Sequence, residues 1–300
     1  MKIGIVGPGA IGSFLACLLS DENEVDLIGK VDRDINEIKV IGESYTSGKV
    51  NYSDDPSQLI EDDIIIIATK SFDTRSAMSF IEDYISNKSI ILTLQNGLNN
   101  EEIISEFVGE KRTIGGITSH GVTFIKPGTV KHAGEGDTII GAYPKGNNKK
   151  VEKVSKIFNR SGLKTDISNN ILRNIWEKGI INSAINPITA LSGIKNGTLL
   201  DNDNLRDLMN ITVNESCEVG KKYVDLSNSK MIKKTSEVAS KTSENISSML
   251  QDIKNEKKTE IEQINGAIIK KGKNKGIETK VNRVLFNLIK FKENEYLQDF

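Results

Sequence analysis

The first nineteen residues constrain the fold of this chain more than any other segment. Lys2–Val6 is a short β-rich run; Gly7, Gly9 and Gly12 follow it in the spacing G-x-G-x-x-G, and a helical pattern covers Ile11–Leu19. In a strand–turn–helix unit, the first glycine permits a tight turn, the second lets the backbone approach a pyrophosphate, and the third lets helix and strand pack closely. The helix N-terminus offers free N–H groups to the phosphates. This context predicts a dinucleotide site rather than a structural glycine turn, and its residues are Gly7, Pro8, Gly9, Ala10, Ile11 and Gly12.

The end of the second predicted strand, Val25–Ile28, indicates which dinucleotide is bound. An NAD enzyme usually carries Asp or Glu there, on the ribose 2′-hydroxyl. Here Gly29 and Lys30 follow the strand, and Asp26 lies too early. A lysine attracts a 2′-phosphate that a carboxylate would repel, and Arg33 could assist. NADPH is therefore the expected cofactor; the alternative is that Lys30 is an ordinary loop lysine.

Strand and helix patterns alternate through the first half of the chain. Ile64–Thr69 and Ile90–Leu94 read as strands and Thr74–Ile85 as a helix, and four consecutive isoleucines are typical of a strand buried on both faces of a parallel sheet. The alternation predicts an α/β fold with a doubly wound, Rossmann-type parallel sheet. The glycine-rich segment from Arg112 to Tyr143 is expected to form the last strands of this domain, before a helix at Val151–Arg160 and a short strand near Lys164–Ile167.

After about residue 168 the β pattern disappears. The chain is therefore expected to form two domains: residues 1–167 bind NADP and residues 168–300 form an all-helical substrate-binding and catalytic domain. Lys230–Glu244 is a solvated helix or a connection. The other predicted helices are Ile171–Leu191, Asn204–Tyr223, Ile246–Lys254, Glu260–Lys270 and Asn282–Lys290.

Composition excludes several classes of protein. Lys and Arg total 40 against 41 Asp and Glu, for a net charge of −1, which argues against nucleic acid as a partner. The strongly apolar run Ile64–Ala68 is far shorter than the ~20 residues of a membrane helix, so no membrane association is expected. Cys17 and Cys217 are too far apart to suggest a metal cluster or a disulfide framework, which fits a cytoplasmic protein. The sequence is compatible with a homodimer but does not determine the oligomeric state.

A polar stripe marks the helix predicted after residue 170. Lys178, Asn182 and Asn186 are spaced four residues apart and share one helix face. Asparagine is a mediocre choice for a face that only meets water, whereas its amide both donates and accepts hydrogen bonds. We therefore expect a ligand-facing stripe. Reduction of a ketone needs a proton donor, which one of the two histidines of the chain, His120 or His132, could supply. Lys178 also fits that role, because burial can lower the pKa of a lysine toward the working range.

Two further polar groups follow predicted strands. Lys70 comes after Ile64–Thr69, and Asn96 lies in the sequence Gln-Asn-Gly after Ile90–Leu94. Ligands bind at the carboxyl edge of open α/β sheets, although Asn-Gly is also a common turn pair. Taken alone, Ser248 would be part of a helix cap and Glu260 a surface carboxylate.

Several separate blocks, in order, resemble the ketopantoate reductase family over nearly the whole chain. They are Gly7–Gly12, Lys70, Gln95–Gly97, Trp176–Pro187 with Thr189 and Ala190, Ser248–Asp252, Thr259–Ile261, and Asn265 with Gly266. The resemblance implies an N-terminal Rossmann domain, a helical C-terminal domain, and NADPH-dependent reduction of 2-dehydropantoate to (R)-pantoate, on the route to pantothenate and coenzyme A.

Carried over position by position, the resemblance makes Lys178 the catalytic proton donor. Glu260 would bind the hydroxyl group of the substrate and orient Lys178, and Lys70 would lie near the cofactor and the keto acid. The groups that would hold the substrate are Asn96, Asn182, Asn186 and Ser248, and Asn96 would also contact the cofactor. The chain departs from the family pattern twice, with Lys30 where an Arg is frequent and Thr279-Lys280 where Thr-Pro is usual.

Two other functions remain open at this point. The same scaffold could reduce another branched 2-keto acid, although Glu260 and Asn182 offer partners for the hydroxyl group of ketopantoate. A catalytically silent NADPH-binding sensor would keep the glycine motif and lose the polar groups, yet these are present.

Overall fold

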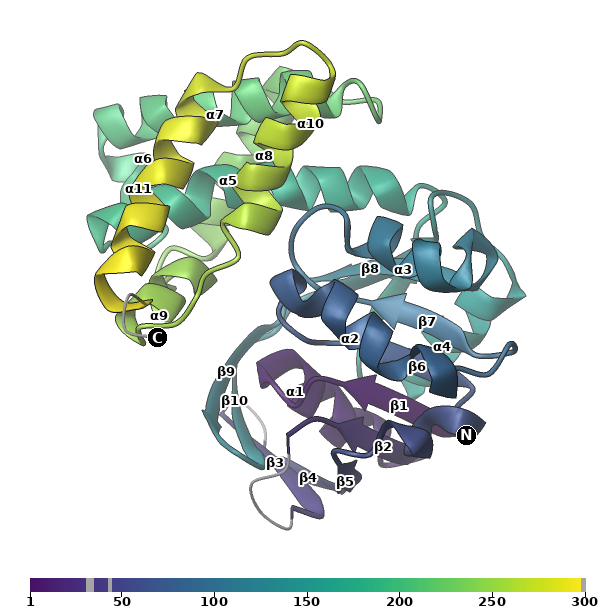
Figure 1. The fold of residues 1–300 in the computed structure, drawn as a ribbon. Coiled ribbons are helices and arrows are strands. Elements are labelled where there is room, and N and C mark those ends of the chain that lie inside the picture. The colour runs from purple at the N-terminus through teal and green to yellow at the C-terminus, as the bar shows by residue number, and fades with distance from the viewer. Residues whose placement is uncertain (31–34, 43–44, 298–300) are drawn as a thin grey trace. The chain divides into compact units, whose positions relative to one another are not determined.

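The computed structural model describes residues 1–30, 35–42 and 45–297 (Figure 1). The chain separates into two compact units: unit 1 is Met1–Gln95 with Asn100–Asn174, and unit 2 is Asn96–Asn99 with Ile175–Phe300. The domain boundary predicted after residue 167 stays a prediction. Within the described residues, no helix is both long enough and apolar enough to cross a bilayer.

The main sheet of unit 1 has the strand order β12-β11-β8-β7-β6-β1-β2-β5. The six strands from β8 to β5 in this order are parallel to their neighbours. Strand β11 is antiparallel to β8, and β12 is parallel to β11. The predicted doubly wound sheet is confirmed, with this one reversed pair beyond β8. Its strands are β1 (Lys2–Val6), β2 (Glu24–Ile28), β5 (Asn51–Ser53), β6 (Ile64–Ile67), β7 (Ile90–Thr93), β8 (Thr113–Thr118), β11 (Thr138–Ala142) and β12 (Thr165–Ile167).

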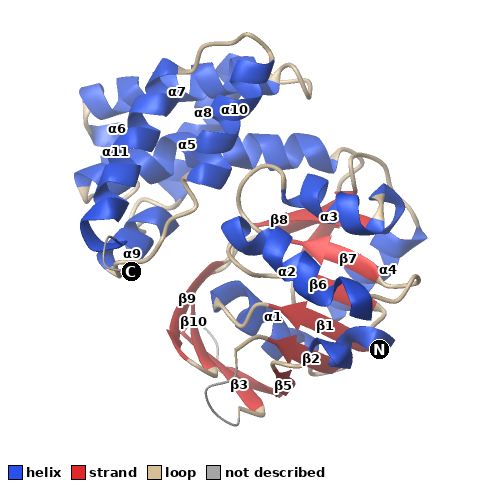
Figure 2. Ribbon diagram, in the orientation of Figure 1, coloured by secondary structure: helices blue, strands red, loops and turns tan. Residues whose placement is uncertain are grey.

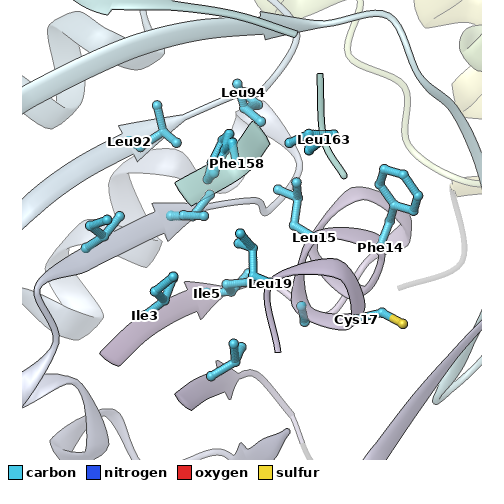
Figure 3. Close-up of a cluster of buried hydrophobic side chains, with 14 of the residues drawn as sticks. Ile3, Ile5, Phe14, Leu15, Cys17, Leu19, Leu92, Leu94, Phe158 and Leu163 are labelled. Atoms are coloured by element: carbon cyan, nitrogen blue, oxygen red, sulfur yellow. The ribbon is translucent and has the colours of Figure 1, made fainter. Parts of the chain in front are cut away.

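Helices cover both faces of this sheet (Figure 2). Ile64 and Ile66 pack toward α1 (Ala10–Leu19) and α4 (Lys149–Arg160), whereas Ile65 and Ile67 pack toward α2 (Thr74–Ile81) and α3 (Asn100–Val108). All four isoleucines are fully buried, as the sequence predicted. Figure 3 shows the first of these cores, with Leu15 and Leu19 of α1 beside Ile3 and Ile5 of β1. Short 3₁₀ turns lie at Pro56–Glu61, Ser71–Asp73, Glu82–Tyr84 and Glu110–Arg112.

A second sheet, not expected from the sequence, packs on the outer side of α1. Its order is β4-β3-β10-β9, formed by β3 (Glu37–Gly42), β4 (Thr46–Lys49), β9 (Gly121–Lys126) and β10 (Thr129–Gly134). Ile38, Val40 and Val130 join the core around α1. The glycine-rich segment therefore does form strands of unit 1, but β9 and β10 belong to this second sheet. Helix α1 lies between two sheets, which explains why its residues are apolar nearly all round.

Unit 2 is helical, as predicted. Its core includes Met249, Leu250, Ile261, Ile264 and Ile289. The stretch Lys230–Glu244, predicted as a solvated helix or a connection, is mostly helix α8 (Asn228–Lys241). The elements are α5 (Ile171–Ser192, whose first turn belongs to unit 1), α6 (Thr198–Asp201), α7 (Asp203–Gly220), α8 (Asn228–Lys241), α9 (Ser248–Lys254), a π-helical turn (Glu262–Gly266), α10 (Ala267–Asn274) and α11 (Lys280–Leu297).

Candidate active site

The glycine loop of unit 1 is shaped by close backbone packing. Gly7 has φ +110°, and a Cβ atom there would lie 2.6 Å from the backbone nitrogen of Thr69. A Cβ atom on Gly12 would lie 1.9 Å from the carbonyl oxygen of Gly7. A side chain at either position would therefore push the loop out of place. Gly9 differs, because a Cβ atom there would meet nothing within 4 Å. The space above Gly9 can therefore hold part of a ligand.

The N-terminus of α1 faces this open space with the properties of an anion site. No side chain among the described residues caps it, and its first turn carries no acidic residue. The Ser13 hydroxyl donates to the Pro8 carbonyl oxygen at 3.1 Å, and the Ser13 N–H donates to the Gly9 carbonyl oxygen at 2.9 Å. These two bonds fix the glycine loop to the first turns of α1. The N–H groups at Ala10 and Ile11 belong to the unbonded first turn that stabilises a phosphate.

A pocket of about 170 Å³ lies beside the glycine loop in unit 1. Lys30 is exposed at its edge, and its carbonyl oxygen accepts a hydrogen bond from the Tyr52 hydroxyl at 2.7 Å. Asp26 is buried, accepts from the Asn51 side chain at 3.0 Å and is not among the residues that line this pocket. Arg33 falls outside the described residues. The pocket is lined by Pro8, Ser13, Leu27, Lys30, Ile35, Ile38, Tyr52, Phe124, Pro127 and Gly128.

Lys70 lies at the same edge of the sheet as the glycine loop. It is half-buried and directly follows Thr69, whose backbone nitrogen packs against Gly7. The neighbouring strand ends in Gln95, which donates to the Thr69 carbonyl oxygen at 2.8 Å and accepts from the Thr93 hydroxyl at 2.9 Å. Gln95 therefore holds the two strand ends together, while Lys70 stands next to the dinucleotide loop.

The predicted polar stripe lies on α5 in unit 2. Lys178 and Asn182 are half-buried, and Asn186 is 7% exposed. The helix continues through Pro187, which has no N–H to donate to the carbonyl oxygen of Ser183 four residues earlier. The side chain of Asn265 supplies the missing donor at 2.9 Å. A side chain from the far end of the sequence thus completes the helix that carries the stripe.

Glu260 is a buried carboxylate rather than a surface one. It is 6% exposed, and the Asn96 side chain donates to its Oε2 atom at 3.3 Å. The sequence predicted a helix over Glu260–Lys270, but this was wrong at its start: Glu260 precedes the π-helical turn Glu262–Gly266. Such wide turns interrupt regular helices and frequently occur at functional sites.

The residue before Glu260 is held from α11. Glu293 is fully buried, and its Oε1 atom accepts from the backbone N–H of Thr259 at 2.7 Å and from the Thr259 hydroxyl at 2.6 Å. Lys290 bridges Glu293 at 2.7 Å and Glu262 at 2.9 Å. Sequence reasoning missed Glu293, because a glutamate in a Lys- and Glu-rich helix reads as a surface residue.

Asn96–Asn99 is the short segment that brings Asn96 into unit 2. Gly97 has φ +97°, and a Cβ atom there would lie 2.9 Å from the carbonyl oxygen of Gln263. That same carbonyl accepts from the Leu98 N–H at 2.9 Å. Leu98 is buried against Gly179, the neighbour of Lys178 on α5. The segment therefore touches both the helix with the stripe and the segment with Glu260.

Ser248 is placed differently from the other predicted residues. It is the exposed first residue of α9. Its neighbour Ser247 is the helix cap: it accepts from the Leu250 N–H at 3.2 Å and from the Thr189 hydroxyl at 2.8 Å. A role of Ser248 in substrate binding stays a prediction.

The two histidines form a pair in unit 1. The Nδ1 atom of His120 lies 3.1 Å from the Nε2 atom of His132, and the Phe14 ring packs against both. Burial and the neighbouring His132 lower the pKa of His120 below its usual value. Because the two imidazoles contact each other and pack against Phe14, a structural role explains them better than a role as the catalytic acid.

The groups gathered in unit 2 suit acid–base chemistry on a small polar molecule. They comprise one ammonium group, three amides and one buried carboxylate, from Lys178, Asn96, Asn182, Asn186 and Glu260. Among the residues that the structure describes, no group of three or more His, Cys, Asp or Glu side chains could hold a metal ion. The ammonium, amide and carboxylate groups of these five side chains suit proton transfer and hydrogen bonding to a substrate.

Comparison with known proteins connects this site to one family. The family model described as ketopantoate reductase PanE/ApbA matches residues 3–145, and its C-terminal counterpart matches residues 170–293. A 2-dehydropantoate 2-reductase of Pyrococcus horikoshii is 43% identical over 98% of both chains.

Comparison with solved structures indicates the same family. A PanE/ApbA family ketopantoate reductase from Ralstonia eutropha superposes with a TM-score of 0.90 at 26% identity, covering 99% of this chain and 100% of that one. A D-mandelate dehydrogenase with NADH and anilino(oxo)acetate superposes with a TM-score of 0.92 at 28% identity, covering 99% of both chains. The chain therefore belongs to the ketopantoate reductase family.

Proposed function

We propose that this protein reduces 2-dehydropantoate (ketopantoate) to (R)-pantoate with NADPH. The observation that carries the proposal is the buried Glu260 carboxylate bonded to the Asn96 amide, in a chain 43% identical to a 2-dehydropantoate 2-reductase. A buried carboxylate needs hydrogen-bond donors. The hydroxyl group of ketopantoate would be one, which favours this substrate over branched 2-keto acids that lack it.

NADPH would bind to the first domain, residues 1–167, and would supply the hydride. The residues present fit it: space above Gly9, an uncapped N-terminus of α1, and Lys30 at the edge of a pocket. The pyrophosphate would meet the backbone of residues 7–12, and Lys30 would pair with the 2′-phosphate. Lys70 would approach the nicotinamide end of the site.

The helical domain, residues 168–300, would bind the keto acid together with Asn96. Lys178 would donate the proton to the carbonyl oxygen as the hydride arrives at the carbon. Glu260 would accept from the substrate hydroxyl and orient Lys178. Asn182, Asn186 and Ser248 would hold the rest of the substrate.

The direct test is the loss of nicotinamide absorbance when ketopantoate is added to the protein with NADPH. We expect rapid oxidation with ketopantoate and much slower oxidation with 2-ketoisocaproate. Faster turnover of 2-ketoisocaproate would move the assignment to another 2-keto acid on this scaffold. NADPH binding without turnover of either substrate would support the sensor function instead.

The role of Lys178 can be separated from that of Glu260. Lys178→Ala should lower turnover by roughly 10² to 10⁴ with NADPH affinity unchanged, and Glu260→Ala should mainly raise the KM for ketopantoate. If the two act as a unit, the double variant should lose less than the product of the single losses. Lys195→Ala is the matched control, since Lys195 forms an exposed pair with Glu244. Unchanged turnover in Lys178→Ala would redirect the search for the acid to His120.

We also propose a cytoplasmic location and a homodimeric state. Cys17 and Cys217 are both buried and unpaired, and burial raises the pKa of each thiol to about 11. Thiols of this kind fit a reducing compartment.

A further inference from the structure

A network of buried polar groups surrounds Gln95, the last residue of unit 1 before the chain enters unit 2 at Asn96. The side-chain nitrogen of Gln95 donates to the Thr69 carbonyl oxygen at 2.8 Å and to the Thr69 hydroxyl at 3.1 Å. The side-chain oxygen of Gln95 accepts from the Thr93 hydroxyl at 2.9 Å, and this hydroxyl accepts from the Gln95 backbone N–H at 3.1 Å. A carbonyl oxygen can only accept, so Thr69 requires the nitrogen of the amide on its side.

The Thr69 side of this network adjoins the glycine loop. The backbone nitrogen of Thr69 lies so close to Gly7 that a Cβ atom there would be 2.6 Å away from it. Lys70 directly follows Thr69 and caps the 3₁₀ turn Ser71–Asp73. By bonding to Thr69, Gln95 therefore fixes the backbone against which the glycine loop packs and the point from which Lys70 extends.

The other side of the network holds both ends of the Asn96–Asn99 segment. The Thr74 hydroxyl on α2 lies 3.2 Å from the Gln95 side-chain oxygen and 2.9 Å from the Asn100 side-chain oxygen. Gln95 and Asn100 are the residues directly before and after the segment, and both are buried. Consecutive Cα atoms lie about 3.8 Å apart, so a fixed Gln95 restricts where the backbone of Asn96 begins.

We propose that Gln95 is a positioning residue for hydride transfer. This inference rests on the proposed function, in which Lys70 approaches the nicotinamide and Asn96 binds the keto acid. Gln95 would touch neither ligand. Its single amide controls the geometry of two groups that the reaction needs, Lys70 through Thr69 and Asn96 through the chain. A misplacement of about 1 Å at a reacting centre can lower a rate by about 100-fold.

Two substitutions at Gln95 test the proposal by single-turnover kinetics. Gln95→Met keeps the length of the side chain without its hydrogen bonds, and Gln95→Glu places an oxygen against the Thr69 carbonyl oxygen. Protein in excess over NADPH is mixed with the 2-keto acid that the wild type reduces fastest, and the loss of nicotinamide absorbance is followed. We expect the rate constant to fall about 10- to 100-fold in both variants. The dissociation constant of NADPH should change little, because Ser13 holds the glycine loop independently of Gln95.

The single-turnover rate constant separates positioning from a purely structural role. Because folded protein exceeds NADPH, the rate constant does not depend on how much of the preparation is active. The matched control is Asn159→Leu, which removes another bridging amide of unit 1. The Asn159 side chain donates to the Ser155 carbonyl oxygen at 2.8 Å and to that of Thr165 at 2.9 Å, and accepts from the Thr165 N–H at 3.0 Å. This control should be less stable than the wild type and keep the wild-type rate constant.

A milder variant covers the case in which neither Gln95 variant folds. Thr93→Val preserves the shape of a buried side chain and removes only the hydroxyl that bonds to Gln95, so its rate constant should fall about 3- to 10-fold. A wild-type rate constant in folded Gln95→Met, or in Thr93→Val, would overturn this inference and leave the proposed function intact. A wild-type protein that reduces no 2-keto acid would overturn both.

Discussion

Replacing Glu293 tests how the segment that carries Glu260 is held in place. Glu293 is fully buried, accepts two hydrogen bonds from Thr259, and pairs with Lys290. Thr259 immediately precedes Glu260, so its position sets where the Glu260 carboxylate points. Glu293→Ala removes the acceptor of both bonds and the buried partner of Lys290, while Glu293→Gln keeps an acceptor but loses the charge.

The magnitude follows from these contacts. A buried donor left without an acceptor costs about 1 to 3 kcal/mol, and Glu293→Ala leaves two such donors on Thr259. The two contacts overlap, so they do not add in full, and Lys290 is partly exposed and keeps its pair with Glu262. We expect Glu293→Ala to lower the free energy of unfolding by about 2 to 4 kcal/mol, and Glu293→Gln by about 1 to 2 kcal/mol, since hydrogen bonds to charged groups are the stronger ones.

Urea titration measures the stability, and steady-state kinetics on the folded variants measure the site. The KM for the keto acid should rise in both variants, and the KM for NADPH should not change because the proposed NADPH site lies in unit 1 and Glu293 in unit 2. Glu237→Gln on α8 is the control, as its pair with Lys233 is exposed and long, at 3.9 Å. A stability loss below about 1 kcal/mol in Glu293→Ala would refute the energetic reasoning. A destabilised variant with wild-type KM for the keto acid would refute the link to Glu260.

Three further predictions concern other parts of the molecule. Lys30→Asp should raise the KM for NADPH by about 10- to 100-fold and change that for NADH little; a wild-type preference for NADH would contradict the assignment of Lys30. Burial and the nearby Asp26 carboxylate raise the pKa of Asp62 to about 8. The folded state therefore keeps a proton that the unfolded state loses near pH 4, so the contribution of Asp62 to stability falls as the pH rises from about 4 to about 8. Asp62→Asn should remove most of this slope in thermal melts, and a slope equal to that of the wild type would contradict the pKa. Asn265→Ala should cost about 1 to 3 kcal/mol because Pro187 leaves the Ser183 carbonyl oxygen without a helical donor; Pro187→Ala supplies that donor, so the double variant should lose less than Asn265→Ala alone, and purely additive losses would argue against the compensation.

Much of unit 1 could be predicted because local patterns determine it. The glycine spacing after β1 requires a loop in close contact with backbone, and the four isoleucines of β6 require burial on both faces of the sheet. The structure shows both. The second sheet could not be predicted, since β4 (Thr46–Lys49) has no apolar alternation, and its partner β3 pairs on the other side with β10, a strand distant in sequence. The apolar character of α1 all round was a signal that it is covered on two sides.

Part of the candidate site could also be predicted from the sequence, and part could not. Helical spacing was enough to group Lys178, Asn182 and Asn186, because four residues make roughly one turn. The contact between Asn96 and Glu260 joins residues 164 positions apart, and only the folded chain brings them together. Nor could the sequence distinguish Ser247 from Ser248: which one caps α9 depends on the position of the Thr189 hydroxyl.

The passage of Asn96–Asn99 into unit 2 means that the two halves of this protein are not interchangeable modules. A fragment that begins at Ile175 would lack the Leu98 N–H that bonds to the Gln263 carbonyl oxygen and the Asn96 amide that bonds to Glu260. During synthesis the ribosome releases this loop long before the helices that receive it, so the site around Glu260 closes only after nearly the whole chain has emerged. A chimaera of two relatives joined at a single point near residue 174 would therefore mix the parents inside the site itself.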